Sequence, residues 1–415
     1  MRDALLLTER GRAQALLEMR LDRRARLVAA SGATPFSGTP ALVYLVTKDT
    51  LLTWMARGDG SLELSRSAVS RDSLGRLVRQ MRLDFGVEPD TDAWAPAVQS
   101  GAVTRGMAVS AISRNARSDS KAARALAALL LPASLGQTFR NDEEVLIVTS
   151  GVLALVPFAA LPSLSDNAAM PAHFTMRYSP SLAVAAELDA ANATENRTMP
   201  QMLNALVVGN PVMPTLAMST SGGERSRLDS LPWARTEARW VAAKLGVHPL
   251  LDAEATESTV SRSMKNASIV HLATHGMAYA SELRARDSYV VFAADSAKDG
   301  FLTVGELIDH GDLHANLVVL SACQTGLGNI RQGEGVVGLQ RAFLAAGARS
   351  LLVSLWSVDD QATSLLMQQF YEHWLDDANH PTKAGALRRA QNDVRAMPRY
   401  SKPRYWAAFQ LVGAK

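Results

Sequence analysis

The second half of the chain alternates apolar runs with helical patterns, and this alternation limits the folds that the chain can adopt. The apolar runs, typical of buried strands, lie at 205–208, 268–274, 289–293, 316–322, 350–355 and 409–412. The helical patterns lie at 233–245, 336–346, 361–374 and 382–395. Alternation at these lengths predicts an α/β fold whose mostly parallel sheet is covered by helices on both faces.

The first half is less regular. Leucines spaced among charged residues predict an amphipathic helix at 4–28, and the segments 41–46 and 51–55 predict a β-hairpin. A polar stretch begins near residue 190, where we place the main boundary. The expected parts are therefore an N-terminal helix at 1–32, a first half at 33–190 and a second half at 191–415.

Composition excludes several classes of protein. Hydrophobic residues make up 47% and charged residues 20% of the 415 residues, as in folded globular proteins. The chain has 43 Lys and Arg against 40 Asp and Glu, so no direct nucleic-acid binding is expected. No apolar run approaches the roughly 18 residues that span a bilayer, and the start of the chain does not resemble a secretory signal. We expect a cytoplasmic protein without membrane contact.

Two predicted strands end in residues that can carry chemistry. His275 and Gly276 follow one run, and Cys323, the one cysteine of the chain, follows another. Neighbouring parallel strands end on the same side of a sheet, so the imidazole and the thiol can meet there. An imidazole can take the proton of a thiol and later protonate a leaving amine, as peptide cleavage requires. The backbone N–H groups of Gly276 and Cys323 could bind the oxyanion.

Other interpretations of these residues are weaker. A free cysteine is usually a small buried hydrophobe, but Cys323 lies where its strand surfaces, and a single cysteine excludes a Cys-based zinc cluster within the chain. His271 and His275 form H-x-x-x-H without the glutamate of a zincin helix, so we expect no metal and assign His271 to strand packing or to support of its neighbours.

The segment G-E-G-V-V-G at 333–338 matches a dinucleotide-binding pattern and is expected to open the helix at 336–346. It lies about a dozen residues beyond its strand, and Glu334 would repel a pyrophosphate. No P-loop and no G-x-S-x-G occurs in the sequence. We therefore expect no cofactor.

The motifs around the two strand ends are similar to a known family. H-L-A-T-H-G, L-S-A-C-Q-T-G, G-E-G-V-V-G-L-Q-R-A-F and S-L-W-S-V-D-D-Q-A-T together resemble the CHAT family, bacterial relatives of caspases and separase. The likeness is densest at 265–375 and extends over roughly 35–415. It implies a caspase-like sheet in which 33–190 is an inactive pseudo-protease half and 191–415 the catalytic half. It also implies that His275 and Cys323 form the catalytic dyad.

The resemblance also suggests where a substrate would bind. The strand 352–356 resembles the edge of caspase-like proteases to which an extended peptide adds as a further strand. Leu355, Trp356, Asp359 and Asp360 are the candidate substrate-binding residues, and a carboxylate there could hold a basic P1 side chain. The two aspartates could equally be the N-cap and the first-turn charge of the helix that starts near Gln361.

We therefore expect a cysteine endopeptidase that cleaves a specific partner protein. CHAT domains commonly follow helical repeats that sense a partner, and no such repeat is visible here. Regulation would then come from a separate protein or from the N-terminal helix and first half. The family alone suggests a role in bacterial antiviral defence or cell death. The alternative is a catalytically silent CHAT-like scaffold that only binds partner proteins.

Overall fold

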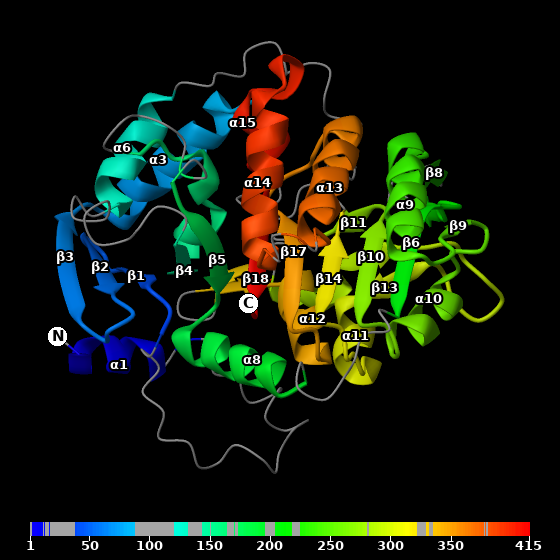
Figure 1. The fold of residues 1–415 in the computed structure, drawn as a ribbon, viewed down its shortest axis with the longest axis horizontal. Coiled ribbons are helices and arrows are strands. Elements are labelled where there is room, and N and C mark those ends of the chain that lie inside the picture. Colours follow the sequence, from blue (N-terminus) through cyan, green and yellow to red (C-terminus); the bar gives the residue numbers. More distant parts are fainter. Residues whose placement is uncertain are drawn as a thin grey trace.

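The core of the fold is a single large sheet. The computed structural model describes residues 2–10, 12, 16, 38–87, 120–131, 143–149, 151–163, 170, 173–195, 204–217, 225–279, 282–321, 329–331, 335–376, 378 and 381–415. Within these residues an 11-stranded sheet has the order β3-β2-β1-β4-β5-β18-β17-β14-β10-β6-β9 (Figure 1). The expected mixed α/β architecture with a mostly parallel sheet is confirmed.

The strands of the second half form a parallel block. They are β6 (Ala205–Pro211), β9 (Leu250–Asp252), β10 (Ile269–Ala273), β14 (Leu317–Leu320) and β17 (Ser350–Ser354). The pairing of β10 with β14 runs from Ile269 opposite Leu317 to Leu272 opposite Leu320. Every residue of β10, β14 and β17 is buried. Strands covered on both faces are expected to be apolar along their whole length, which explains why these runs were recognisable in the sequence.

The first half contributes the remaining strands. An antiparallel meander contains β1 (Ala41–Val46), β2 (Thr50–Ala56) and β3 (Leu62–Ala68). On its other side β1 pairs in parallel with β4 (Glu144–Val148), and β4 pairs in parallel with β5 (Thr175–Ser179). The last strand, β18 (Phe409–Gly413), pairs antiparallel with β17 and parallel with β5. The C-terminal strand therefore joins the two halves into one sheet.

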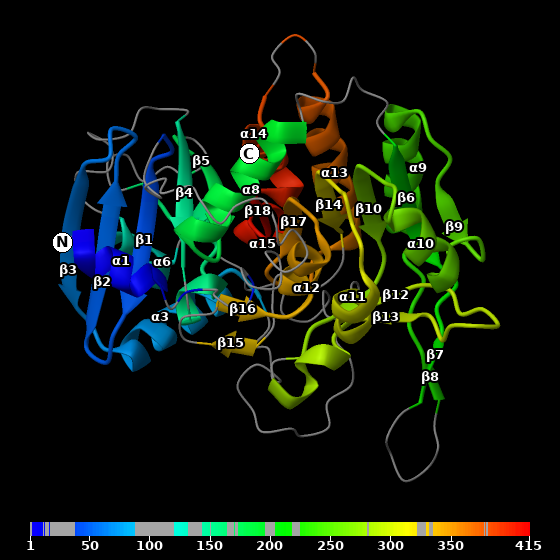
Figure 2. The ribbon, with the colours of Figure 1, turned by 90° about the horizontal axis from the view of Figure 1, so that it is seen from below.

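Helices cover both faces of the sheet (Figures 1 and 2). On one face α9 (Pro232–Leu245), α13 (Asp360–Trp374) and α14 (Lys383–Ala396) pack side by side, and on the other lie α11 (Val304–His310) and α12 (Leu339–Ala346) (Figure 2). The remaining helices are α1 (Arg2–Arg10), α3 (Arg71–Asp84), α6 (Lys121–Leu130), α8 (Leu182–Glu195), α10 (Glu257–Met264) and α15 (Pro403–Trp406). None of the helices in the described parts of the chain has the length and apolar character needed to cross a bilayer.

Small strand pairs complete the structure. A three-stranded sheet contains β11 (Gly276–Met277), β12 (Tyr289–Val291) and β13 (Phe301–Thr303). Two further pairs are β7 (Thr215–Ala217) with β8 (Arg225–Arg227), and β15 (Asn329–Arg331) with β16 (Gly335–Val337). The glycine segment does lead into a helix, since Gly338 is the N-cap of α12, but the expected start at 336 was wrong, because 335–337 is strand β16 and α12 begins at Leu339. Residues 333 and 334 lie outside the described residues.

The N-terminal helix is attached to the first half by specific contacts. Leu5 is fully buried and packs in a cluster with Val43 and Trp54. The Glu9 carboxylate accepts a hydrogen bond of 2.6 Å from the backbone N–H of Leu182, the first residue of α8. Most of the rest of the predicted helix at 4–28 lies outside the described residues. Since α8 spans 182–195, the boundary placed near residue 190 falls inside a helix, and the three-part division stays a prediction.

A buried lysine lies near the amino end of β14. Lys383, in the first turn of α14, is 4% exposed, and its Nζ donates a hydrogen bond of 2.7 Å to Asn316 Oδ1. Burial, followed by the positive charges of Arg349 and Arg177, lowers the pKa of Lys383 to about 7. The Arg177 guanidinium is itself buried and pairs with Glu144 and Asp189. The lysine therefore shares its surroundings with a larger ionic network.

The lowered pKa makes stability depend on pH. A lysine in an unfolded chain has a pKa of about 10.4, so between pH ~7 and ~10 the unfolded chain binds one more proton than the folded chain. The free energy of unfolding should therefore rise with pH by up to about 1.4 kcal/mol per pH unit through this group. In urea unfolding from pH 7 to 9, wild type should gain stability relative to Lys383→Met. The exposed control Lys121→Met should follow wild type, and parallel profiles for all three proteins would contradict this assignment.

Candidate active site

His275 lies just beyond the carboxyl end of β10, which ends at Ala273. It is 2% exposed. The buried Thr274 hydroxyl donates a hydrogen bond of 2.8 Å to the Val291 carbonyl, and the Val291 N–H donates one of 2.9 Å to the His275 carbonyl. Val291 of β12 thus binds both the Thr274 side chain and the His275 carbonyl. The small sheet beside the main one fixes where the imidazole is placed.

The imidazole ring of His275 is oriented by a backbone carbonyl. Its Nε2 lies 2.8 Å from the carbonyl oxygen of Asp229. A carbonyl oxygen only accepts hydrogen bonds, so Nε2 carries the proton, and in the neutral ring Nδ1 is the basic nitrogen. The arrangement leaves the general-base function to Nδ1.

The loop that supplies this carbonyl is held by Asn210. Asn210, in β6, has φ of 45°, a conformation that asparagine tolerates better than most residues. Its Oδ1 accepts hydrogen bonds from the Leu231 N–H at 2.6 Å and from the Ser230 hydroxyl at 3.1 Å. Three segments far apart in the sequence therefore cooperate to orient one ring. Neither Asn210 nor Asp229 was predicted from the sequence, and the one local signal was the Asn-Pro pair at the end of an apolar run.

The Gly276 N–H points away from the small sheet. Gly276 lies opposite Val290 in the antiparallel pair β11–β12. Because the adjacent hydrogen bond joins the Val291 N–H to the His275 carbonyl, Gly276 and Val290 form a non-hydrogen-bonded pair. The N–H of a residue in such a pair faces away from the partner strand. This orientation is compatible with the oxyanion-binding role predicted for Gly276.

The predicted nucleophile follows the strand next to β10. Ser321, directly after β14, is fully buried. Cys323 and its N–H lie outside the described residues. The last paired residues of the two strands are Leu272 and Leu320, and His275 and Cys323 each come three positions later. The structure therefore fixes the strand that leads to the thiol, and the role of Cys323 stays a prediction.

Leu355 and Trp356 follow β17, which lies inside the sheet. Residues 350–352 are paired with β14 on one side and β18 on the other, so no peptide can add there, and the predicted substrate-binding edge at 352–356 was wrong for residue 352. The Leu355 N–H donates to the Ala408 carbonyl at 2.9 Å, and the Trp356 Nε1–H donates to the Arg404 carbonyl at 3.0 Å. Both residues are buried. A role in substrate binding stays a prediction for the backbone beyond 354.

Arg82 reaches the same segment from α3 in the first half. Two of its guanidinium nitrogens, Nη1 and Nη2, each lie 3.2 Å from the Leu355 carbonyl oxygen. Its guanidinium carbon lies 5.6 Å from the centre of the Trp356 ring, within the range of a cation–π contact. The guanidinium is nearly buried, which strengthens both interactions. A residue of the first half thus anchors the segment that leaves β17.

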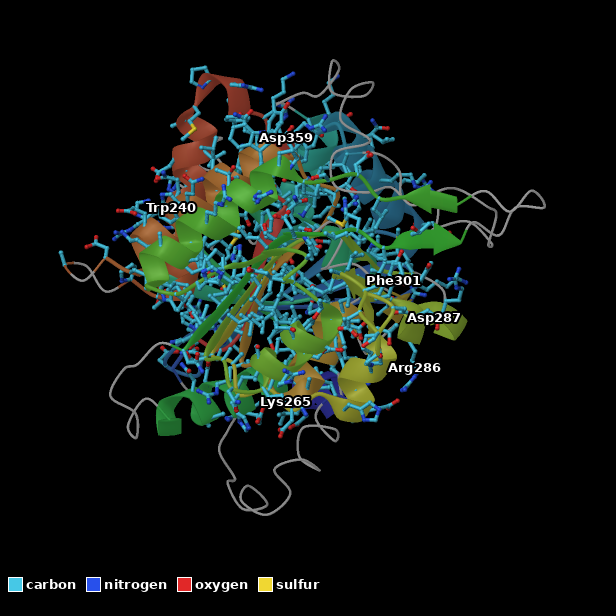
Figure 3. All side chains as sticks on the ribbon, turned by 90° about the vertical axis from the view of Figure 1, so that its right-hand side faces the viewer. Trp240, Lys265, Arg286, Asp287, Phe301 and Asp359 are labelled. Carbon is cyan, nitrogen blue, oxygen red and sulfur yellow. The ribbon has the colours of Figure 1, made fainter. Side chains whose placement is uncertain are left out.

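The two aspartates beyond this segment both have structural roles. Asp359 is the N-cap of α13, because its Oδ1 accepts a hydrogen bond of 2.9 Å from the Ala362 N–H. Asp360 Oδ2 accepts one of 2.9 Å from the Trp233 N–H in the first turn of α9. Asp359 lies at the upper end of the face shown in Figure 3. The capping interpretation is confirmed for Asp359, and substrate binding by either carboxylate stays a prediction.

His271 is used inside the core. Its Nε2 lies 3.0 Å from Glu237 Oε1 of α9, and its Nδ1 lies 3.3 Å from the hydroxyl of Tyr371 in α13. All three side chains are fully buried. Burial, followed by the charge of Glu237, raises the pKa of Tyr371 well above its usual value. Among the described residues no group of three or more His, Cys, Asp or Glu side chains could hold a metal ion.

Comparison with known families identifies the domain. The model of the CHAT domain matches residues 120–414, well over half of the chain. The chain belongs to the CHAT-domain family. Tetratricopeptide repeat protein 28 of Homo sapiens is 29% identical over 310 residues, and its Mus musculus counterpart is 30% identical over 310 residues. In both cases the match covers 66% of this chain and 12% of the relative, so the CHAT-domain chain spans a small part of these proteins.

Two solved structures similar to this CHAT domain are a separase and a gingipain. The separase of the Saccharomyces cerevisiae separase–securin complex superposes with a TM-score of 0.51 at 10% identity, over 91% of this chain and 30% of that chain. The Arg-specific cysteine proteinase gingipain R gives a TM-score of 0.45 at 10% identity, over 68% of this chain and 64% of that chain. The superposition with separase supports a caspase-like fold for this CHAT domain.

The hydrogen bond to Asp229 predicts the tautomer of His275. In long-range ¹H–¹⁵N NMR spectra the neutral ring should carry its proton on Nε2, because the carbonyl can only accept. The exposed His248 supplies a reference signal in the same spectrum. Asn210→Ala should loosen the loop and reduce the excess of this tautomer. A His275 ring protonated on Nδ1 in wild type would contradict the arrangement.

The Arg82 contacts predict a link between the halves of the CHAT domain. Arg82→Met removes two charge-assisted hydrogen bonds and should lower the free energy of unfolding by about 2 kcal/mol. Hydrogen–deuterium exchange should also accelerate at the amides just after Ser354. Arg76→Met, an exposed position on the same helix, is the matched control. Equal exchange after Ser354 in both variants would show that Arg82 does not hold this segment.

Proposed function

We propose that this CHAT domain is a cysteine endopeptidase in which His275 and Cys323 form the catalytic dyad. The observation that carries the proposal is the register of β10 with β14, in which Leu272 lies opposite Leu320. Neighbouring strands lie about 4.8 Å apart, and residues 275 and 323 are each three positions past this pair. If the register continued beyond this pair, the imidazole and the thiol would lie at the same end of the sheet.

The proposed mechanism assigns a role to each group. His275 Nδ1 takes the proton of the Cys323 thiol, and the thiolate attacks the carbonyl carbon of the scissile peptide bond. The N–H groups of Gly276 and Cys323 donate to the oxyanion of the tetrahedral intermediate. The imidazolium then protonates the leaving amine, and water hydrolyses the thioester that remains. The Asp229 carbonyl stabilises the imidazolium through Nε2–H.

The substrate is proposed to be a specific protein. The backbone after Ser354, which includes Leu355 and Trp356, would guide the peptide, and Asp359 and Asp360 would add negative charge near a basic P1 side chain. The similar separase was solved in complex with another protein, securin, and the curated relatives are tetratricopeptide repeat proteins. Both findings support recognition of a protein and control by a regulatory partner, in bacterial defence or cell death as the family resemblance suggests.

Alkylation of the single cysteine tests the dyad directly. A thiolate paired with an imidazolium reacts with iodoacetamide faster than a free cysteine at pH 6, where a free thiol is almost fully protonated. His275→Gln should slow the reaction by about tenfold or more, since the thiolate loses its partner. The exposed His248→Gln is the matched control and should react like wild type. No second cysteine complicates the measurement.

Cleavage by the same proteins decides between enzyme and scaffold. Wild type, tested on a peptide library and on candidate partner proteins, should cut substrates that Cys323→Ala leaves intact. Labelling at the rate of free cysteine, unaffected by His275→Gln, together with retained partner binding would instead identify a silent scaffold. Cleavage by Cys323→Ala at the wild-type rate would exclude the dyad.

A further inference from the structure

A cavity of about 410 Å³ lies between α10 and α11. These helices lead into the amino ends of β10 and β14, so the cavity is at the opposite end of the strands from the candidate active site. Figure 3 shows this separation, with Lys265 at the lower end of the face and Asp359 at the upper end. A volume of this size is in the range of sites for small organic ligands.

The inner wall of the cavity is apolar. It is formed by Met264, Leu302, Leu307 and Leu313, none of which is more than 4% exposed. These side chains come from α10, β13, α11 and the segment after α11, so the wall is built from four separate pieces of rigid structure. An aliphatic chain placed here would bury its surface without requiring these residues to leave the core.

The rim of the cavity beside α10 carries two positively charged side chains without ion pairs among the described residues. Arg262 and Lys265, at the end of α10, are exposed, and within the described part of the chain neither side chain has a hydrogen bond or an ion pair. The Ser261 hydroxyl oxygen also lines the cavity, is buried, and has no hydrogen-bond partner among those residues. A buried hydroxyl without a partner is uncommon and favours a ligand group that would accept its hydrogen bond.

The negative charges around the cavity are mostly used elsewhere. Glu306 pairs with Lys298, and it also accepts hydrogen bonds from Thr303 in the capping box of α11. The Asp312 side chain is 75% exposed and lies 3.8 Å from His314 Nε2, so water screens its charge. Arg262 and Lys265 are therefore the cations at the cavity that have no ion pair within the described part of the chain.

We propose that this cavity binds a small amphipathic carboxylate. The aliphatic part would lie on the apolar wall, and the carboxylate would accept hydrogen bonds from Arg262, Lys265 and the Ser261 hydroxyl. Inorganic phosphate would leave the apolar wall unused, and a cationic amphiphile would be repelled at the rim. This proposal does not depend on whether the CHAT domain is a peptidase.

The proposed site is also connected to the support of His275. Leu302 of the cavity wall lies opposite Val290 in the pairing of β13 with β12. The next residue of β12, Val291, accepts a hydrogen bond from the Thr274 hydroxyl and donates one to the His275 carbonyl. A ligand on the apolar wall would thus contact the same small sheet that positions the imidazole.

Isothermal titration calorimetry with octanoate, below its micelle-forming range, tests the proposal. Octanoate should bind saturably at one site, and butyrate should bind about tenfold or more weakly because it lacks four methylene groups. Octyltrimethylammonium has the aliphatic chain with the opposite charge and should show no saturable binding. Ser261→Ala should weaken octanoate binding severalfold.

Charge reversal supplies the matched comparison. The double variant Arg262→Glu/Lys265→Glu should weaken octanoate binding by about tenfold or more. The control Lys121→Glu/Arg239→Glu changes the net charge equally at exposed helix positions away from the cavity, and it should bind like wild type. The proposal is overturned if octanoate does not bind saturably, if octyltrimethylammonium binds as tightly, or if both double variants bind equally.

Discussion

The parallel pairing of β10 with β14 is the interaction on which the candidate site depends. Both strands are fully buried, and their ladder holds Leu272 opposite Leu320. A slip of β10 by one residue would turn each of its side chains to the opposite face, and His271 would lose its contacts with Glu237 and Tyr371, so the specific packing on each face specifies the register. The register therefore also constrains the positions of residues just past the strand ends, such as His275. The apolar core therefore aligns the polar chemistry, although it supplies none of the reacting groups.

The second half does not form this site by itself. β18 lies between β17 and β5, so the C-terminal strand completes the sheet of one half and begins that of the other. Arg177 of β5 donates to the Gly413 carbonyl, and Arg82 of α3 binds the Leu355 carbonyl near the candidate substrate-binding residues. Separation of the halves would remove the Gly413 acceptor of Arg177, which keeps Glu144 and Asp189, and the Leu355 acceptor of Arg82, and the loss of hydrogen bonds to buried charged groups costs free energy. The first half thus acts as a structural partner of the candidate catalytic half.

Sequence patterns predicted the large strands and helices because burial on both faces makes them apolar. They missed α10, whose sequence E-S-T-V-S-R-S-M has few apolar residues and whose start is marked mainly by the Thr256 cap. They also assigned 336 and 337 to a helix, but these residues belong to β16, where pairing with β15 outweighs helical spacing. His275 was predictable from its place at a strand end. Asp229 was not predictable, because it lies 46 residues away in the sequence and contributes only a backbone carbonyl. Every residue type has such a carbonyl, so the sequence does not mark this position.

His271 lies within β10 and His275 just beyond it, and this difference in position determines their chemistry. Tyr371, whose pKa is raised by burial, keeps its proton and can donate to His271 Nδ1, so Nε2–H of that ring donates to Glu237. Both nitrogens of His271 are then committed to side chains inside the core. His275 lies four residues later, beyond the strand, and its Nε2 is bound by a neutral carbonyl instead of a carboxylate. A carbonyl orients the ring without fixing its charge, and this difference suits His275 rather than His271 to proton transfer.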